Sequence, residues 1–149
     1  MIQNYNELIT AFATHVGMDA DTLAATQEIV IEGLSVGLLY DGDETMGDIV
    51  YFTQLGTPPA QRLTSVYKTM LEANNLWVGT GGCTLGIQAQ TGGVVLCGRM
   101  DVTGVTAEGL ALLLDAFTDT ALFWKKIIAD DAPSDGAADL PPAEYLLRG

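Results

Sequence analysis

Apolar residues recur along the chain with two different periods, which predict helices and strands in alternation. Near the amino terminus they stand three and four positions apart and stop before Gly17, the spacing of a helix with one apolar face (Tyr5, Leu8, Ile9, Phe12, Ala13 and Val16). After a short link, residues 29–31, 34–40 and 49–55 are rich in β-branched and aromatic side chains. Gly33 and the turn at residues 41–44 separate them. We expect three antiparallel strands here.

Two further helices are predicted from the same helical spacing. Thr57 is a suitable N-cap and Pro58 suits a first helical turn, so we expect the second helix to start there and to end near residues 74–75. Its apolar stripe is Leu63, Val66, Tyr67, Met70 and Leu71. Thr106 can cap the last helix, which continues to Ile128 with a wide apolar arc (Leu110, Leu113, Leu114, Phe117, Ala121, Trp124 and Ile128).

Residues 74–95, NNLWVGTGGCTLGIQAQTGGVV, carry six glycines. A phosphate-binding loop would continue into Lys and Ser or Thr, and no Lys follows here. The alternation from residue 83 to 89 favours a strand, and the glycines are explained by tight passages and positive φ.

The glycine-rich segment and residues 94–100 are therefore predicted to form a hairpin. A two-residue turn at Thr91-Gly92 pairs 89 with 94 and 87 with 96. One face then holds Cys83, Leu85, Ile87, Ala89, Val94, Leu96 and Met100. A three-residue turn with a bulge would mix the two faces, so we prefer the first register. It points Cys83 and Cys97 to opposite faces, where they cannot form a disulfide.

The predicted fold is α+β: helix, three strands, helix, two strands and helix, with an antiparallel twisted sheet packed against the helices. We expect one domain over residues 1–129. Residues 130–149 are acidic, rich in Pro and Ala and poor in apolar side chains before Tyr145-Leu146-Leu147, so we expect a flexible tail.

Charge and composition exclude several functions. The 149-residue chain has a net charge of -13, which disfavours nucleic acid and anionic membranes as partners. No apolar run is long enough to insert in a membrane, and no signal-peptide pattern opens the chain, so we expect a cytoplasmic protein. Two cysteines and one histidine without ligand spacing predict no metal, and we expect no cofactor.

The strands leave two interpretations open, because both of their faces are apolar. If Leu34, Val36, Leu38, Tyr51 and Leu55 face the last helix, then Leu39, Val50 and Phe52 lie on the other face, beside the stripe of the first helix. Either helices cover both faces, or one face stays open for a partner. A small enzyme using Cys97 and a plain assembly or adaptor subunit are the other classes of function that we consider; we expect no catalytic role for His15.

Four segments resemble, in order and spacing, the Tir-chaperone (CesT) family of class I type III secretion chaperones: LLYDGDETMGDIVYFTQLG, MLEANNLWVGTGGCTLGI, GGVVLCGRM and GLALLLDAFTDTALFWKKI. The resemblance implies a homodimer in the bacterial cytoplasm, without catalysis. It implies binding of the N-terminal segment of a secreted effector in extended form, which keeps the effector soluble and competent for secretion. Components of the secretion apparatus are further possible partners.

The resemblance also suggests where partners bind. Grooves between helix and sheet would hold effector side chains, and open strand edges would pair with the effector backbone. We therefore expect effector binding at Leu8, Phe12, Leu39, Val50 and Phe52. The second helix and the following segment commonly form the dimer interface in this family, here Tyr67, Met70, Leu71, Leu76 and Trp77; smaller residues are more usual at the position of Trp77.

Overall fold

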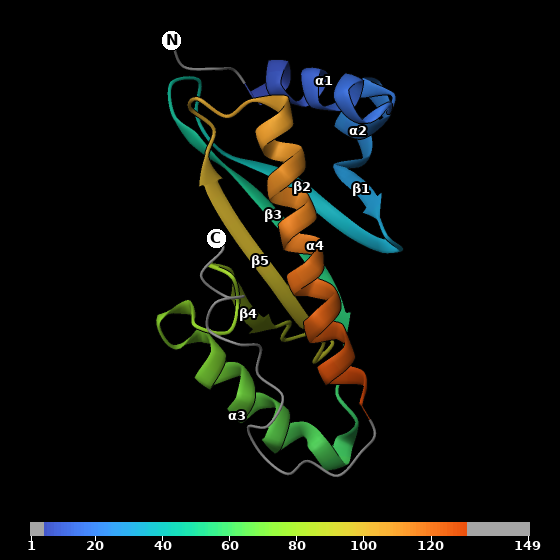
Figure 1. Ribbon diagram of the computed structural model, residues 1–149, viewed down its shortest axis with the longest axis vertical. Helices are drawn as coiled ribbons and strands as arrows, with labels where there is room; N and C mark the ends of the chain where they lie inside the picture. The colour runs from blue at the N-terminus through green and yellow to red at the C-terminus, as the bar shows by residue number, and fades with distance from the viewer. Residues whose placement is uncertain (1–4, 131–149) are drawn as a thin grey trace. The chain divides into compact units, whose positions relative to one another are not determined.

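The computed structural model describes residues 5–130, which form helices and one five-stranded antiparallel sheet (Figure 1). The elements are α1 (Tyr5–Val16), α2 (Ala20–Thr26), β1 (Glu28–Ile31), β2 (Leu34–Gly42), β3 (Gly47–Gly56), η1 (Ala60–Arg62), α3 (Leu63–Asn74), η2 (Asn75–Trp77), β4 (Thr84–Ile87), β5 (Val94–Asp101) and α4 (Ala107–Ala129). The strand order is β1-β2-β3-β5-β4. The predicted α+β fold is confirmed. Of the expected tail, residues 130–149, only Asp130 is among the described residues.

One helix, α2, is present where the sequence predicted only a link. The side chain of Asp19 caps it by accepting hydrogen bonds from the amide and hydroxyl of Thr22, at 3.0 and 2.7 Å. Gln27 ends it in the left-handed conformation. Only Leu23 is buried, so this seven-residue helix has no apolar stripe from which it could be predicted.

The chain divides into two compact units, and unit 1 consists of the residues up to Phe52 together with Arg99–Thr118. Its core is made by the apolar face of α1, alternate residues of β2 and β3, and the first part of α4. Leu34, Val36 and Leu38 are buried as predicted. The ring of Tyr51 meets Phe117 of α4 edge to face, with 5.0 Å between centroids, so Tyr51 faces the last helix as predicted.

Unit 2 consists of Thr53–Gly98 together with the residues from Asp119 on. The second helix that the sequence predicted lies in this unit. It begins later than expected, and the prediction of Thr57 as its N-cap was wrong. A residue that precedes proline is kept out of the helical region, and Pro58 and Pro59 follow each other here. Pro59 is extended, with φ -55° and ψ 144°, so the helical turns start with η1 at Ala60 and α3 begins at Leu63.

The β4–β5 hairpin forms, but in a register two residues away from the predicted one. Ile87 pairs with Val94 and Leu85 with Leu96. Residues 88–93 form a longer turn, closed by a 2.8 Å hydrogen bond from the Gln88 amide to the Gly93 carbonyl, and Gly92 has a φ of +72°. A shift of two residues leaves the faces unchanged, so Cys83, Leu85, Val94 and Leu96 are buried together as predicted. Both cysteines are free thiols, consistent with the prediction of no disulfide.

The passage from α3 to the hairpin depends on a close contact. A Cβ at Gly79 would overlap the Cβ of Ala73, and the carbonyl of Gly79 accepts a 2.8 Å hydrogen bond from the buried indole of Trp124. The predicted structural role of these glycines is confirmed at this position.

No helix among residues 5–130 is long and apolar enough to cross a membrane.

Candidate binding surfaces

The first candidate surface is the sheet face of unit 1 that points away from Tyr51. Side chains alternate along strands, so Leu39 of β2 and Val50 and Phe52 of β3 point away from the buried set. The ring of Phe52 lies over Gly37, where an added Cβ would overlap it. Val30 of β1 pairs with Ser35, so its side chain lies on the same face, and Val30 is 69% exposed. The structure therefore brings Leu39, Val50 and Phe52 together, with Leu39 exposed and the other two half-buried.

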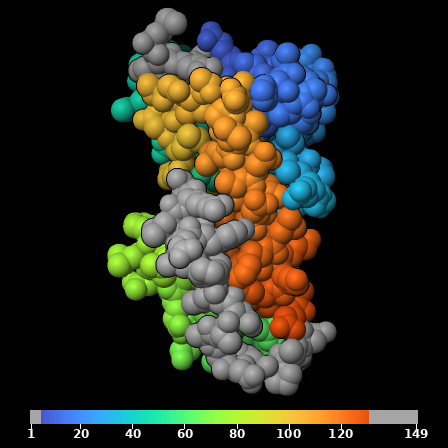
Figure 2. Space-filling view, in the orientation of Figure 1, coloured from blue at the N-terminus to red at the C-terminus, as the bar shows by residue number. Residues whose placement is uncertain are grey.

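Leu8 and Phe12 lie elsewhere in unit 1, which corrects the expectation that the first helix flanks this face. Both are core residues, at most 1% exposed. Phe12 instead lines a groove of about 570 Å³ to which α1, β1 and α4 contribute residues. The groove is lined by Phe12, His15, Val16, Met18, Glu28, Ile29, Val30, Ile31, Ala111, Leu114 and Asp115. Figure 2 shows α1 and β1 beside the first part of α4 on one surface.

β1 forms one wall of this groove. It is an edge strand, because it is the first strand of the sheet order and pairs with β2. The outer backbone groups of an edge strand are available to another extended chain. Along β1, Ile29 lies on the buried face of the sheet and Val30 on the opposite, open face, and all four residues of this edge strand line the groove.

Charged residues lie at the ends of β2, β3 and β5 in unit 1. Arg99 donates hydrogen bonds to Asp41 at 2.5 Å and to Asp48 at 2.9 Å. The bond to Asp41, followed by the charge of Asp48, raises the pKa of Arg99 above its usual value. Asp41 alternates with Leu39, and Asp48 with Val50, so this cluster limits the apolar face at one end. Sequence reasoning missed it, although charged residues at strand positions were visible.

The second candidate surface lies in unit 2, where α3 passes into η2. Leu71, Leu76, Trp77 and Val78 are exposed apolar residues there, at 72, 76, 56 and 45%. Leu76 and Trp77 both have a positive φ, 55° and 57°, which is unfavourable for residues with a side chain. Of the other predicted interface residues, Tyr67 is half-buried and Met70 is buried. The fold thus maintains two consecutive strained residues that present Leu and Trp to solvent.

The sequence predicted no metal site, because its Cys and His residues lack the spacing of metal ligands. Among residues 5–130, no group of three or more His, Cys, Asp or Glu residues could hold a metal ion. Cys97 is half-buried, with its Sγ 3.9 Å from the carbonyl oxygen of Gly98.

Comparison with known proteins defines the class to which this fold belongs. The Yersinia pestis type III secretion chaperone SycH, solved in complex with a stable fragment of YscM2, superposes with a TM-score of 0.56 at 18% identity, over 80% of this chain and 98% of that one. The structure of the ExsC–ExsE complex gives 0.56 at 17% identity, over 85% and 95%. The HopA1–SchA chaperone–effector complex gives 0.58 at 12% identity, over 83% and 91%. The fold is that of these secretion chaperones.

The sequence gives the family directly. The model of the Tir chaperone protein (CesT) family matches residues 7–125, so the chain belongs to this family of type III secretion chaperones. A search of curated protein sequences finds no match to the chain.

Proposed function

We propose that the protein binds the N-terminal segment of a secreted effector as an extended strand at β1 and keeps it soluble and competent for secretion. The observation that carries the proposal is the edge strand β1, which forms the wall of an apolar groove in a chain of the CesT family. SycH and SchA were each solved in complex with another protein, which supports a binding function for this fold.

The geometry of β1 explains how one extended segment would be held. A strand added at this edge gains backbone hydrogen bonds and turns alternate side chains to opposite faces. One set would enter the groove beside Phe12, Val16 and Leu114. The other set would lie on the open face that begins with Val30 and continues to Leu39, Val50 and Phe52. Leu8 is fully buried and does not line the groove, so in this proposal it supports α1 from the core.

The proposal includes a homodimer formed through the exposed patch of Leu71, Leu76, Trp77 and Val78. Such a patch on a chain with a net charge of -13 is unusual unless another surface covers it. Tyr67 and Met70 would support the patch from within α3. The protein would work in the bacterial cytoplasm and without catalysis, since strand addition and apolar burial require no reacting group. An enzyme that depends on Cys97 would instead lose activity when this thiol is alkylated.

The test is co-expression with the N-terminal segments of proteins that the host secretes, scored by the solubility of each segment and by its co-elution with the chain. Val16→Asp changes the groove, because Val16 lines it and is 39% exposed. Burial of one such side chain contributes roughly 1.5 to 3 kcal/mol, so binding should weaken about ten- to a hundredfold. Phe52→Asp should have a similar effect through the open face.

Leu112→Asp is the matched control, because Leu112 is 63% exposed and does not line the groove. Circular dichroism and the thermal midpoint establish that each variant is folded. The proposal fails if no secreted protein's segment is solubilised. The site assignment fails if folded Val16→Asp and Phe52→Asp variants bind as tightly as Leu112→Asp.

A further inference from the structure

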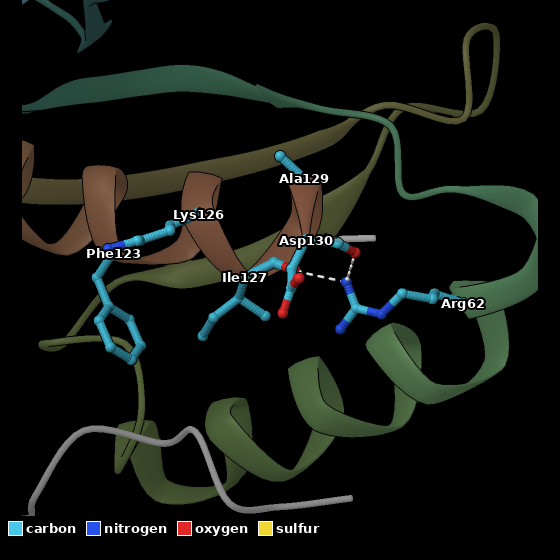
Figure 3. Close-up of a pocket in the computed structure, with 6 residues that line it drawn as sticks. All are labelled: Arg62, Phe123, Lys126, Ile127, Ala129 and Asp130. Carbon is cyan, nitrogen blue, oxygen red and sulfur yellow. Dashed lines mark hydrogen bonds between the residues drawn. The ribbon is translucent and has the colours of Figure 1, made fainter. Parts of the chain in front are cut away.

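A cavity of about 590 Å³ in unit 2 is not used by the proposed function. It is lined by Arg62 of η1, by four residues near the end of α4 and by the residue that follows this helix: Phe123, Lys126, Ile127, Ala129 and Asp130 (Figure 3). Phe123 and Ile127 are half-buried and give the cavity its apolar part. Two of the chain's six Lys and Arg residues, Arg62 and Lys126, are also in its lining, together with one carboxylate, that of Asp130. The cavity therefore combines apolar surface with an excess of positive charge in a strongly acidic protein.

Arg62 is the unusual member of this lining. It is only 7% exposed, although arginine is rarely buried without partners. Its Nη1 donates a 2.8 Å hydrogen bond to the Ile127 carbonyl and another to the Asp130 carbonyl (Figure 3). A cation suits these C-terminal carbonyls of α4 because of the helix dipole. Its Nε, however, is buried and has no hydrogen-bond partner among the described residues.

An unpaired buried donor on a guanidinium is unfavourable, and a carboxylate is its best acceptor. The chemistry of the cavity therefore selects an occupant with apolar side chains next to a carboxylate. The chain contains such a segment. Glu144-Tyr145-Leu146-Leu147 joins one carboxylate to the largest apolar cluster among residues 131–149.

The chain between α4 and the C-terminal segment keeps this segment close to the cavity. The chain leaves α4 at Asp130, which itself lines the cavity. Fourteen residues, 131–144, connect it to Tyr145, and at roughly 3.3 to 3.6 Å each they reach up to about 50 Å. A connection of this length gives an effective concentration of about a millimolar. A weak intrinsic affinity is therefore sufficient.

We propose that the cavity is the docking site of the chain's own C-terminal segment, with Tyr145, Leu146 and Leu147 against Phe123 and Ile127 and the Glu144 carboxylate on Arg62. The docked segment covers the end of α4 and supplies the acceptor that Arg62 Nε lacks. Docking is reversible, because it involves only a few side chains. It needs neither an effector nor the groove at β1, so it is tested on the free protein.

The experiment places the photo-crosslinking residue benzoylphenylalanine at position 145 of the full-length chain. After irradiation, mass spectrometry should locate most crosslinks in residues 60–63 and 119–130. Benzoylphenylalanine at Ala137 is the control and should give dispersed crosslinks at lower yield. An equal mixture of ¹⁵N-labelled and unlabelled chains, refolded together, separates docking within one chain from docking on a second copy. Crosslinks spread over the whole surface, or joining heavy to light chains, would overturn the proposal.

Matched variants of the full-length protein test the chemistry by hydrogen–deuterium exchange. Leu146→Asp with Leu147→Asp should raise the exchange rate of amides in residues 123–130 at least fivefold. Ala137→Asp with Ala138→Asp adds the same charge and should leave these rates unchanged. Glu144→Gln should raise them more than Asp139→Asn, which removes the same charge. Equal rates in the two double variants would refute the apolar contact, and equal rates in the two single variants would refute the pairing with Arg62.

Discussion

At the scale of single residues, one close contact fixes how the chain leaves α3. Gly79 faces Ala73 so closely that a Cβ does not fit, and its carbonyl is held by Trp124, which is fully buried. The two contacts are independent: one restricts the residue at position 79 by size, and the other binds its backbone to α4. Together they explain why this position is glycine although its φ is not positive.

Gly79→Ala is therefore expected to destabilise the protein. Overpacking of this kind costs about 1 to 3 kcal/mol, which lowers the thermal midpoint by about 3 to 15 °C in a chain of this size. Gly86→Ala is the matched control, because nothing lies within 4 Å of a Cβ at Gly86 and its φ is not positive. Differential scanning calorimetry on both variants decides the matter: equal midpoints would show that the chain tolerates the contact by a small shift.

The turn between β2 and β3 predicts a specific pH dependence. Asp43 accepts hydrogen bonds from the Thr45 hydroxyl at 2.7 Å and from the amides of Thr45 and Met46 at 2.7 and 3.0 Å. The bond from the Thr45 hydroxyl, with the two amide bonds, lowers the pKa of Asp43. A lowered pKa stabilises the folded turn above the ordinary aspartate pKa, and the effect is lost as pH falls through the folded-state value.

NMR titration of the Thr45 and Met46 amides should thus give a midpoint below the ordinary aspartate value of about 3.9. Asp43→Asn keeps an acceptor oxygen but cannot titrate, so this step should vanish from both amides while the turn remains. A midpoint at or above 3.9 in the natural protein would show that these hydrogen bonds do not form in solution.

At the scale of elements, periodicity predicted what long segments do and failed where backbone constraints decide. The stripes of α1 and α4 and the alternation of β2 and β3 have enough apolar positions to give type, extent and buried face. α2 has one buried residue and rests on a cap, which hydrophobic spacing does not detect. The start of α3 was misplaced because two consecutive prolines keep the chain extended. The hairpin register was wrong by two residues, and the apolar pattern could not reveal this, because such a shift keeps every side chain on its face.

For the candidate surfaces as well, periodicity predicted some features and tertiary contacts decided others. Leu39, Val50 and Phe52 were placed on one face by alternation alone, and the structure agrees. Phe12 was predicted on that face, but it lines the groove on the other side of β1, since the side on which α1 packs depends on tertiary contacts. The cavity at Arg62 was not predicted at all. An arginine at the start of a helix carries no sequence signal of burial.

The element from α3 to η2 gives a prediction about assembly. Leu76→Glu and Trp77→Glu place charges in the proposed dimer interface, where an unpaired charge is strongly unfavourable. Light scattering should give about twice the chain mass of 15.7 kDa for the natural protein and a monomer, or aggregates, for each variant. Leu112→Glu, at an apolar residue whose exposure lies between those of Leu76 and Trp77, should stay dimeric. A natural protein that is monomeric at all concentrations would exclude the homodimer.

At the scale of the whole molecule, the described fold and the C-terminal residues are expected to contribute unequally to stability. Among the described residues 5–130, the large side chains that are fully buried extend from Leu8 to Ile128, and α4 ends at Ala129. The Asp130 carbonyl accepts a hydrogen bond from Arg62, so the structurally justified boundary follows Asp130. The residues beyond it include one apolar cluster, Tyr145-Leu146-Leu147, which we propose docks reversibly.

A chain that ends at Asp130 should therefore fold and keep its thermal midpoint within about 5 °C of the full-length protein, because about 1 kcal/mol moves the midpoint of a domain this size by roughly 3 to 5 °C. Its amides in residues 123–130 should exchange faster, as in Leu146→Asp with Leu147→Asp. The same shortened chain should solubilise an effector segment normally, since the proposed groove lies in unit 1. A loss of much more than 5 °C would mean that Tyr145, Leu146 and Leu147 belong to the core. An unchanged midpoint together with unchanged exchange would mean that they do not dock.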